Sequence, residues 1–463
     1  INLIMKTKFK LIIILAVLII HIFLMTGLSM IKHYNLLSDF DLSQNERIVH
    51  NSINGDFFYF DIDNSEHLGI HVNLIYIFIF PFYFLFPKTM LLFFLQSLSF
   101  AIGAFFIYKI CQKKKFQFYQ SLIITILYLF SANNFFVNLE EFHPVVFAVP
   151  FLIMSIYFSF SKNIKFMILA MIGFILVKEN MVFTLFFIGI YFLIMKRKRL
   201  FVITSTIAII YFIILISFFP SSYLSFLNER YSFENKPFLD LKLMTDETHL
   251  NYFSSIIIST AIISLLNPLS IVGIPIFFQN YLSNEGFQHC FLGHHSIVLF
   301  SILFISLIFA LKKTQKYNKT IFKISFILFI FCLIIFNIKA YGLTKEINNY
   351  QNTIFSNCII NERSGSNLLL IFKLKDNINY IQEFNNIPKD KKLLLGSMTA
   401  SYFSNYKEIA NINIDYNKEK NYYDYIILSQ DVFKGYFPIL KELYPGLTEN
   451  ILEENKKIII YST

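Results

Sequence analysis

Long apolar segments recur along the first 340 residues of the chain. Eleven of them, of about 14 to 23 residues, predict an α-helical polytopic membrane protein with about eleven transmembrane helices. Several are shorter than the roughly 20 residues that a straight spanning helix needs, and the pair that meets at Asn267-Pro268 could form one broken or re-entrant helix. The predicted spans are residues 9–31, 89–111, 117–131, 144–160, 164–177, 180–195, 200–219, 253–266, 269–282, 296–311 and 321–339.

Residues 71–87 are also apolar and rich in aromatic side chains, but a full span here would place the lysines at 113–115 on the outer side. Because aromatic rings are favoured at the interface between lipid and water, we predict a helix that lies in or dips into the outer interface. Residues 1–340 are thus expected to form a multi-pass membrane domain with a long outer loop at residues 32–88.

The composition changes after residue 340, where Asn, Lys, Glu, Asp and Tyr become common. Short apolar segments alternate with helical ones, a pattern typical of a small α/β domain. We therefore predict that residues 341–463 form an extracytoplasmic α/β domain. Its predicted strands are residues 393–395, 425–428 and 457–461, and its predicted helices are residues 377–386 and 437–443.

The charges distinguish the two ends of the predicted spans. Lysine and arginine gather in alternate loops that contain no acid, and the other loops hold the acidic residues. Because cytoplasmic loops are enriched in basic residues, we expect a protein of the inner (plasma) membrane with a cytoplasmic N-terminus. The net charge of +10 then reflects this orientation, so we expect no nucleic acid among the partners. The basic loops contain Lys6, Lys8 and Lys10, residues 113–115, Lys162 and Lys165, residues 196–199, and Lys312, Lys313, Lys316 and Lys319.

Asp39 and Asp41 follow the first predicted span, two residues apart. Two carboxylates at this spacing could supply a general base and a ligand for a metal or a substrate. The same pattern is typical of a solvated loop in which aspartates cap a helix. The motif alone does not decide between the two.

Two further polar groups lie in outer turns. Glu140, Glu141 and His143 lie between the third and fourth spans, where charges often mark function, although ordinary interfacial polarity would also place them there. Lys178 and Glu179 separate two later spans. A lysine on the outer side opposes the usual charge bias, so it could neutralise a phosphate or pair with a nearby acid.

His289, His294 and His295 precede the tenth span. Imidazole binds metals and donates hydrogen bonds to phosphate oxygens. The spacing matches no zinc motif, so these histidines could either serve a site or fill space. Cys290 and Cys358 would both lie outside, where they could form a disulfide.

Taken together, these features resemble the prokaryotic membrane protein family called domain of unknown function 2079. That family is grouped with the GT-C superfamily, whose multi-pass glycosyltransferases use sugars linked to lipid phosphates. The resemblance covers nearly the whole chain and rests on short motifs. These are Asp39-Phe40-Asp41-Leu42 with Gln44, Leu68-Gly69-Ile70-His71-Val72-Asn73, Glu140-Glu141-Phe142-His143-Pro144, Val177-Lys178-Glu179-Asn180, Gly293-His294-His295, and in the tail residues 392–397 and 423–428.

The resemblance implies inverting transfer of a sugar from a polyprenyl-phosphate donor in the membrane lipid to a glycan, lipid or protein acceptor outside. Asp41, or else Asp39, would remove the proton of the acceptor hydroxyl. A divalent cation (Mg²⁺ or Mn²⁺) or basic side chains would balance the charge of the leaving phosphate. Arginine is scarce in the outer turns, so the choice between a metal and Lys178 stays open. The side chains implied in substrate binding are Glu140, Glu141, His143, Lys178, Glu179, His294 and His295.

Two other functions are open: a transporter or flippase of a lipid-linked or anionic substrate, and a non-catalytic membrane scaffold. A transporter would more often carry charges in mid-span and show symmetry between its halves. The predicted spans have clean mid-span positions and the halves differ, which favours the enzyme. A scaffold would tolerate the joint loss of Asp41 and Glu141.

Overall fold

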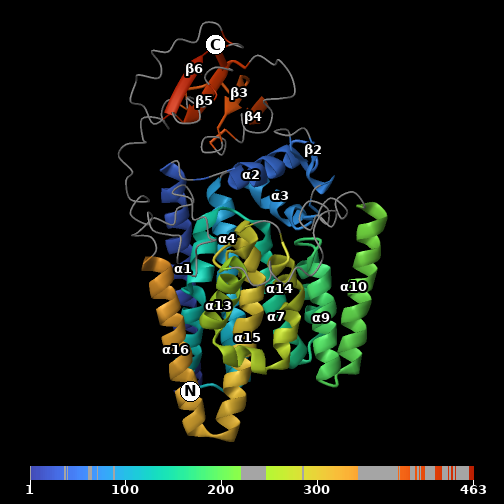
Figure 1. Ribbon diagram of the computed structural model, residues 1–463, viewed down its shortest axis with the longest axis vertical. Helices are drawn as coiled ribbons and strands as arrows, with labels where there is room; N and C mark the ends of the chain where they lie inside the picture. Colours follow the sequence, from blue (N-terminus) through green and yellow to red (C-terminus); the bar gives the residue numbers. More distant parts are fainter. Residues whose placement is uncertain are drawn as a thin grey trace.

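Helices dominate the chain up to Gly342, and a four-stranded sheet lies in its C-terminal part (Figure 1). The computed structural model describes residues 2–35, 38, 40–60, 65–69, 71–86, 89–219, 247–283, 286–342, 384, 386–396, 402, 403, 406, 408–411, 423–429, 436, 440, 441, 444 and 458–462.

Six helical segments of the described chain are long and apolar enough to cross a membrane. A seventh span arises if α5 (Phe118–Leu129) and α6 (Ala132–Glu140), which are bent by 42° to each other, count as one. The helix α15 is the central one, because 89% of its apolar window is buried by other helices. The six segments are α1 (Asn2–Tyr34), α4 (Thr89–Lys113), η2 (Pro144–Phe147) with α7 (Ala148–Ser161), α10 (Lys198–Phe218), η6 (His294–Ser296) with α15 (Ile297–Tyr317), and α16 (Lys319–Gly342).

Every predicted span coincides with a helical segment, and the predicted class, an α-helical polytopic membrane protein, is confirmed. Fewer than eleven segments are long enough to cross a membrane as a straight helix. Four of them have only 8 to 14 residues, below the roughly 20 that a straight span needs. These four are α8 (Ile164–Ile175), α9 (Met181–Ile194), α13 (Glu247–Thr260) and α14 (Ile274–Tyr281).

The chain is broken at Asn267-Pro268, as predicted. Two 3-10 segments, η3 (Ile262–Leu266) and η4 (Pro268–Gly273), separate α13 from α14. The Asn267 side chain accepts a hydrogen bond from the Leu269 N–H at 3.0 Å, so it caps the second segment. Proline fits at that point because the first residue of a helix needs no N–H donor.

Two short helices, α2 (Phe40–Ile53) and α3 (Tyr76–Leu85), lie at the end of the bundle nearest the sheet (Figure 1). The helix α3 occupies the predicted interfacial segment. It packs on α2, and the Tyr83 hydroxyl donates to Glu46 Oε1 at 2.8 Å. The connection between them contains β1 (Tyr59–Phe60), β2 (Ser65–Glu66) and η1 (His67–Gly69).

The C-terminal sheet has the order β4-β3-β5-β6. The strand β3 pairs in parallel with β4 and β5, and β6 is antiparallel to β5. All three predicted strands are present, and β4 was missed. The predicted helices at 377–386 and 437–443 lie largely outside the described residues. The strands are β3 (Lys392–Leu395), β4 (Glu408–Asn411), β5 (Tyr425–Ser429) and β6 (Ile458–Ser462).

The sheet region packs directly on α2. Leu42, Ile48 and Val49 of α2 share one buried apolar cluster with Phe403 and Leu393 of the C-terminal part. Burial of apolar surface stabilises such a contact by about 25 cal/mol per Å². The first outer loop and the C-terminal part are therefore one packed unit.

Candidate functional site

The turn after α6 is held by a buried glutamine of α4. The Gln96 amide donates to the backbone carbonyls of Val137, Asn138 and Glu141, and its carbonyl accepts from the His143 N–H at 2.9 Å. Gln96 is fully buried, so these bonds satisfy backbone groups that water does not reach. The side chains of residues 140–143 are thereby fixed in direction.

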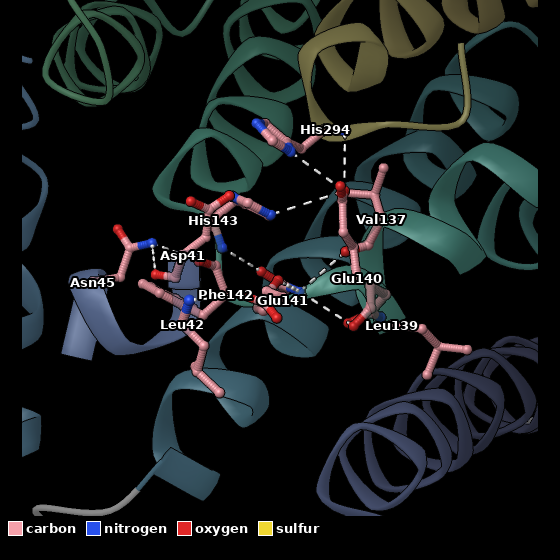
Figure 2. A network of polar contacts seen from close by, with 12 residues as sticks. Asp41, Leu42, Asn45, Val137, Leu139, Glu140, Glu141, Phe142, His143 and His294 are labelled. Carbon is pink, nitrogen blue, oxygen red and sulfur yellow. Dashed lines mark hydrogen bonds and ion pairs between the residues drawn. The ribbon is translucent and has the colours of Figure 1, made fainter. Parts of the chain in front are cut away.

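Glu141 caps α2. Its Oε2 accepts a hydrogen bond from the Leu42 N–H at 2.7 Å, and the Asn45 amide donates to the Phe142 carbonyl at 2.9 Å (Figure 2). A carboxylate is favourable at a helix N-terminus because it meets unpaired N–H groups and the positive end of the helix dipole. The structure thus joins two of the motifs that the sequence singled out, and Glu141 takes a supporting role.

Asp41 lies in the first turn of α2 with an exposed side chain. Its backbone carbonyl accepts from the Asn45 amide at 2.6 Å (Figure 2). Burial and, to a smaller extent, the nearby Asp41 charge raise the pKa of Tyr76 well above its usual range. Asp39 lies outside the described residues.

Glu140, His143 and His294 form a cluster (Figure 2). Glu140 Oε2 is 3.3 Å from His294 Nδ1 and 3.8 Å from His143 Nε2, and the two imidazole rings stack with centroids 3.6 Å apart. The three groups offer one ligand atom each, all within 4.8 Å of one another. Burial and the neighbouring His294 lower the pKa of His143 well below its usual range. The donor set therefore fits one divalent cation.

The other histidines of that motif lie beside the cluster or apart from it. The His295 ring is 4.1 Å from His294, and no described contact joins it to Glu140. His289 packs against His249, with ring centroids 4.4 Å apart. Cys290 is disulfide-bonded, and Cys358, its predicted partner, lies outside the described residues.

Glu179 holds the segment that leads into α3. Its carboxylate accepts from the Val72 N–H at 3.0 Å and lies 3.2 Å from His71 Nδ1. Burial alone would raise the pKa of Glu179, but His71 and Lys178 lower it to about 2. The Asn73 amide adds a bond to the Val177 carbonyl at 2.7 Å. Glu179 is thus a charged anchor for the outer loop.

Lys178 influences both Glu179 and the cluster electrostatically. Its positive charge lowers the pKa of both His143 and Glu179, so it lies within electrostatic reach of both. The side chain is half-buried. It is the one lysine among the predicted site residues.

Three polar residues escaped the sequence analysis. Lys32 is 1% exposed and donates to the carbonyls of Leu139 and Glu140, and its position at the outer end of the first span could have signalled it. Arg47 is 2% exposed and donates to the Tyr406 carbonyl, a contact across 359 residues that no local pattern predicts.

The third is His21, which lies inside α1, fully buried and 3.4 Å from the Asn138 amide. The sequence predicts mid-span positions that are free of charges, and His21 is an ionisable side chain at such a position in α1. The helix α6, buried on all sides, supplies the partner that lets an imidazole lie inside the bundle. This finding weakens one of the arguments against transport.

Comparison with known proteins places the chain by fold and by family. It resembles the crystal structure of ArnT from Cupriavidus metallidurans bound to undecaprenyl phosphate, with a TM-score of 0.52 and 11% identity over 92% of this chain and 94% of ArnT. The apo structure of the same ArnT gives a TM-score of 0.48 and 11% identity over 90% and 94%. The fold is thus GT-C-like.

No curated protein matches the sequence. A family model described as "Predicted membrane protein (DUF2079)" matches residues 32–457, which include α2, the cluster and most of the C-terminal sheet. The protein is therefore a multi-pass membrane protein and belongs to the DUF2079 family.

Proposed function

We propose that the protein is a glycosyltransferase that moves a sugar from a polyprenyl-phosphate donor to an acceptor on the extracytoplasmic face. The observation that carries the proposal is the junction of α2 with the turn after α6, where the exposed Asp41 lies on the same junction as the cluster of Glu140, His143 and His294, whose donor atoms could hold a metal ion. The GT-C-like fold supports this reading, as does the binding of undecaprenyl phosphate by ArnT.

Asp41 acts as the general base in this proposal. Its carboxylate removes the proton of the acceptor hydroxyl while the acceptor oxygen attacks the anomeric carbon. The bond from that carbon to the phosphate oxygen breaks, the configuration inverts, and polyprenyl phosphate leaves with the electron pair. The exposed position of Asp41 in the first turn of α2 suits a group that must meet an incoming acceptor.

The leaving phosphate needs positive charge close by. Lys178 supplies one charge, and Lys32, buried against the carbonyls of residues 139 and 140, adds to the positive potential of the same turn. Glu140, His143 and His294 would hold a cation when one is bound, and that cation would neutralise developing charge on the phosphate. His295 lies beside this cluster as a donor for phosphate or sugar oxygens.

Orientation in the membrane completes the proposal. The basic loops lie in the cytoplasm, and the site, the outer loop at residues 32–88 and the C-terminal domain at residues 341–463 lie outside, in the inner membrane of the cell. The packing of the sheet on α2 supports a role for this domain in covering the site or recognising the acceptor.

The test uses membranes of a host that expresses the full chain, supplied with radiolabelled polyprenyl-phosphate sugars. Label entering lipid, glycan and protein fractions is compared for wild type, Asp41→Asn and Asp56→Asn. Asp56 is a matched control because it is an exposed acid of the same outer loop. We expect transfer to fall by about 100-fold or more in Asp41→Asn and to persist in Asp56→Asn.

Transfer that survives in Asp41→Asn would move the base to another carboxylate, with Asp39 next. Uptake or flipping of labelled lipid without any glycosidic product would favour the transporter. An Asp41→Asn and Glu141→Gln double variant that behaves as wild type in every assay would indicate a scaffold.

A further inference from the structure

Two cations share one aromatic ring near the end of the bundle where α15 leads into α16, opposite the C-terminal sheet (Figure 1). Lys114 follows α4, and Arg197 precedes α10. The Lys114 ammonium lies 4.1 Å from the centre of the Phe160 ring, and the Arg197 guanidinium carbon lies 4.7 Å from it. Lys114 is also 4.2 Å from the centre of the Phe309 ring, which is buried in α15. The two cations thus meet where α4, α7, α10 and α15 come together.

Hydrogen bonds to the backbone hold the surrounding side chains in this arrangement. The Arg197 guanidinium donates to the Ser159 carbonyl at 3.2 Å, near the end of α7. The Lys312 ammonium donates to the carbonyl of Lys115 at 3.2 Å, and Lys115 directly follows Lys114. Three cations, those of Lys114, Arg197 and Lys312, therefore belong to one patch.

No acid of the described residues neutralises the two cations on the Phe160 ring. Neither Lys114 nor Arg197 forms an ion pair within the described part of the chain. Burial and the Arg197 charge lower the pKa of Lys114, because both disfavour its charged form. An anion from outside the chain would offset this cost. The loops of this end contain no Asp or Glu, and they are residues 112–117, 162–163, 195–197 and 312–318.

We propose that Lys114 and Arg197 bind the phosphate of one anionic phospholipid, such as phosphatidylglycerol. Ammonium and guanidinium groups donate strong hydrogen bonds to phosphate oxygens, and basic pockets between membrane helices bind anionic headgroups in this way. A lipid is favoured over a soluble anion because apolar side chains continue the site along the membrane. Ile194 at the end of α9 and Val202 near the start of α10 are both exposed, so an acyl chain can lie beside them.

This site lies apart from the residues of the proposed function. Asp41 and the cluster of Glu140, His143 and His294 lie where α2 meets the turn after α6, whereas Lys114 and Arg197 follow α4 and precede α10. The basic loops are predicted to face the cytoplasm, where the leaflet carries anionic lipids. The bound lipid would join the end of α4 to the start of α10. A failed transfer assay leaves this proposal unchanged.

The experiment measures lipid binding by the full chain, purified in detergent and stripped of lipid. Phosphatidylglycerol and phosphatidylcholine with the same acyl chains are titrated, and bound lipid is counted by native mass spectrometry. We expect one tightly bound phosphatidylglycerol per chain, held at least about tenfold more weakly when Lys114→Gln and Arg197→Gln are combined. Lys113→Gln combined with Lys198→Gln is the matched control, since it removes two exposed neighbouring cations, and it should keep the lipid.

A second measurement uses wild type alone, in case the Lys114 and Arg197 double variant fails to fold. Phosphatidylglycerol should raise the midpoint of thermal unfolding, whereas phosphatidylcholine and inorganic phosphate at the same concentration should not. Equal binding of the two lipids by wild type would overturn the proposal, as would an equal loss of phosphatidylglycerol in the two double variants. A rise in the midpoint with inorganic phosphate alone would contradict it by assigning the site to a soluble anion.

Discussion

The Glu141 carboxylate accepts a hydrogen bond from the Leu42 N–H at 2.7 Å, across 99 residues of sequence. This contact fixes the start of α2, where Asp41 lies, to the turn that carries Glu140 and His143 of the cluster with His294. The acidic motifs that contain Asp41 and Glu141 look alike in the sequence but have different roles in the structure. One offers an exposed carboxylate, and the other holds it in place.

Replacing Glu141 by alanine should loosen α2. The change leaves the Leu42 N–H without its acceptor at a buried helix start, which costs about 1–2 kcal/mol. Hydrogen exchange of residues 40–53 should become faster, and the thermal midpoint should fall. Glu141→Gln, which keeps an acceptor oxygen, should recover most of the protection. Unchanged exchange in Glu141→Ala would show that the cap is unimportant.

Replacing Lys178 by glutamine should reduce transfer without unfolding the protein. The positive charge within reach of the cluster is lost, and one such group at a developing charge contributes about 10²–10³-fold in rate. Steady-state kinetics should show the loss in kcat rather than in KM. Lys162→Gln, an exposed lysine of a predicted inner loop, is the control. Equal activity of the two variants would remove Lys178 from the site.

The outer loop should lose stability in mild acid because of His67. Burial lowers the pKa of this histidine to about 4, against 6.5 for the unfolded chain. Between these values the unfolded state binds more protons, so stability is present above pH 6.5 and is lost as the pH falls towards 4. The full loss is about 3 kcal/mol.

Thermal unfolding of wild type and His67→Gln at pH 5 and 7.5 tests this. Glutamine can still donate to Asn73 Oδ1, which lies 2.9 Å from His67 Nε2, and it does not titrate. The difference between the thermal midpoints at pH 5 and pH 7.5 should be smaller in His67→Gln than in wild type. If the thermal midpoint changes with pH by the same amount in both chains, the acid sensitivity comes from other groups.

Replacing Tyr402 by alanine should release the C-terminal part from the membrane helices. The Tyr402 ring stacks on His33 with centroids 4.3 Å apart, and its hydroxyl donates to the His33 carbonyl. Loss of both contacts costs about 1–2 kcal/mol. Limited proteolysis should cut the variant sooner than the wild-type chain. Tyr402→Phe, which keeps the ring, should show about half of the effect, and equal cleavage of all three chains would contradict the role.

Labelling with a membrane-impermeant maleimide tests the orientation. Asp56 and Asn163 are both exposed and lie in loops predicted to be outside and inside. Asp56→Cys should react in intact cells, whereas Asn163→Cys should react only after permeabilisation. The wild-type chain, whose free cysteines Cys111 and Cys332 are buried and half-buried, gives the background. The reverse pattern would invert the predicted topology.

The helices could be predicted because each spanning helix is a continuous run of mostly apolar residues in the sequence, as in α4 and α10. The strand β4 could not, since Glu408 and Asn411 give it no run of apolar residues. Its place follows from parallel pairing with β3.

The sequence indicated which residues are candidates for the site, but not the role of each one. Charge segregation placed Glu140, Glu141, His143 and His294 on one side, but neighbours in sequence differ in role once folded. Glu140 joins the histidines whereas Glu141 turns to α2, because Gln96 fixes the backbone between them. No local pattern contains that contact.

The contact between α2 and the C-terminal part also determines when the outer loop can complete its folding during synthesis. The Tyr406 carbonyl that receives the Arg47 guanidinium is synthesised 359 residues after Arg47. At 5–20 residues per second, this delay is about 20 to 70 s. Throughout it, the apolar cluster that contains Leu42, Ile48 and Val49 of α2 lacks its C-terminal members, Leu393 and Phe403 among them. The outer loop therefore reaches its final packing only after the last quarter of the chain has been made.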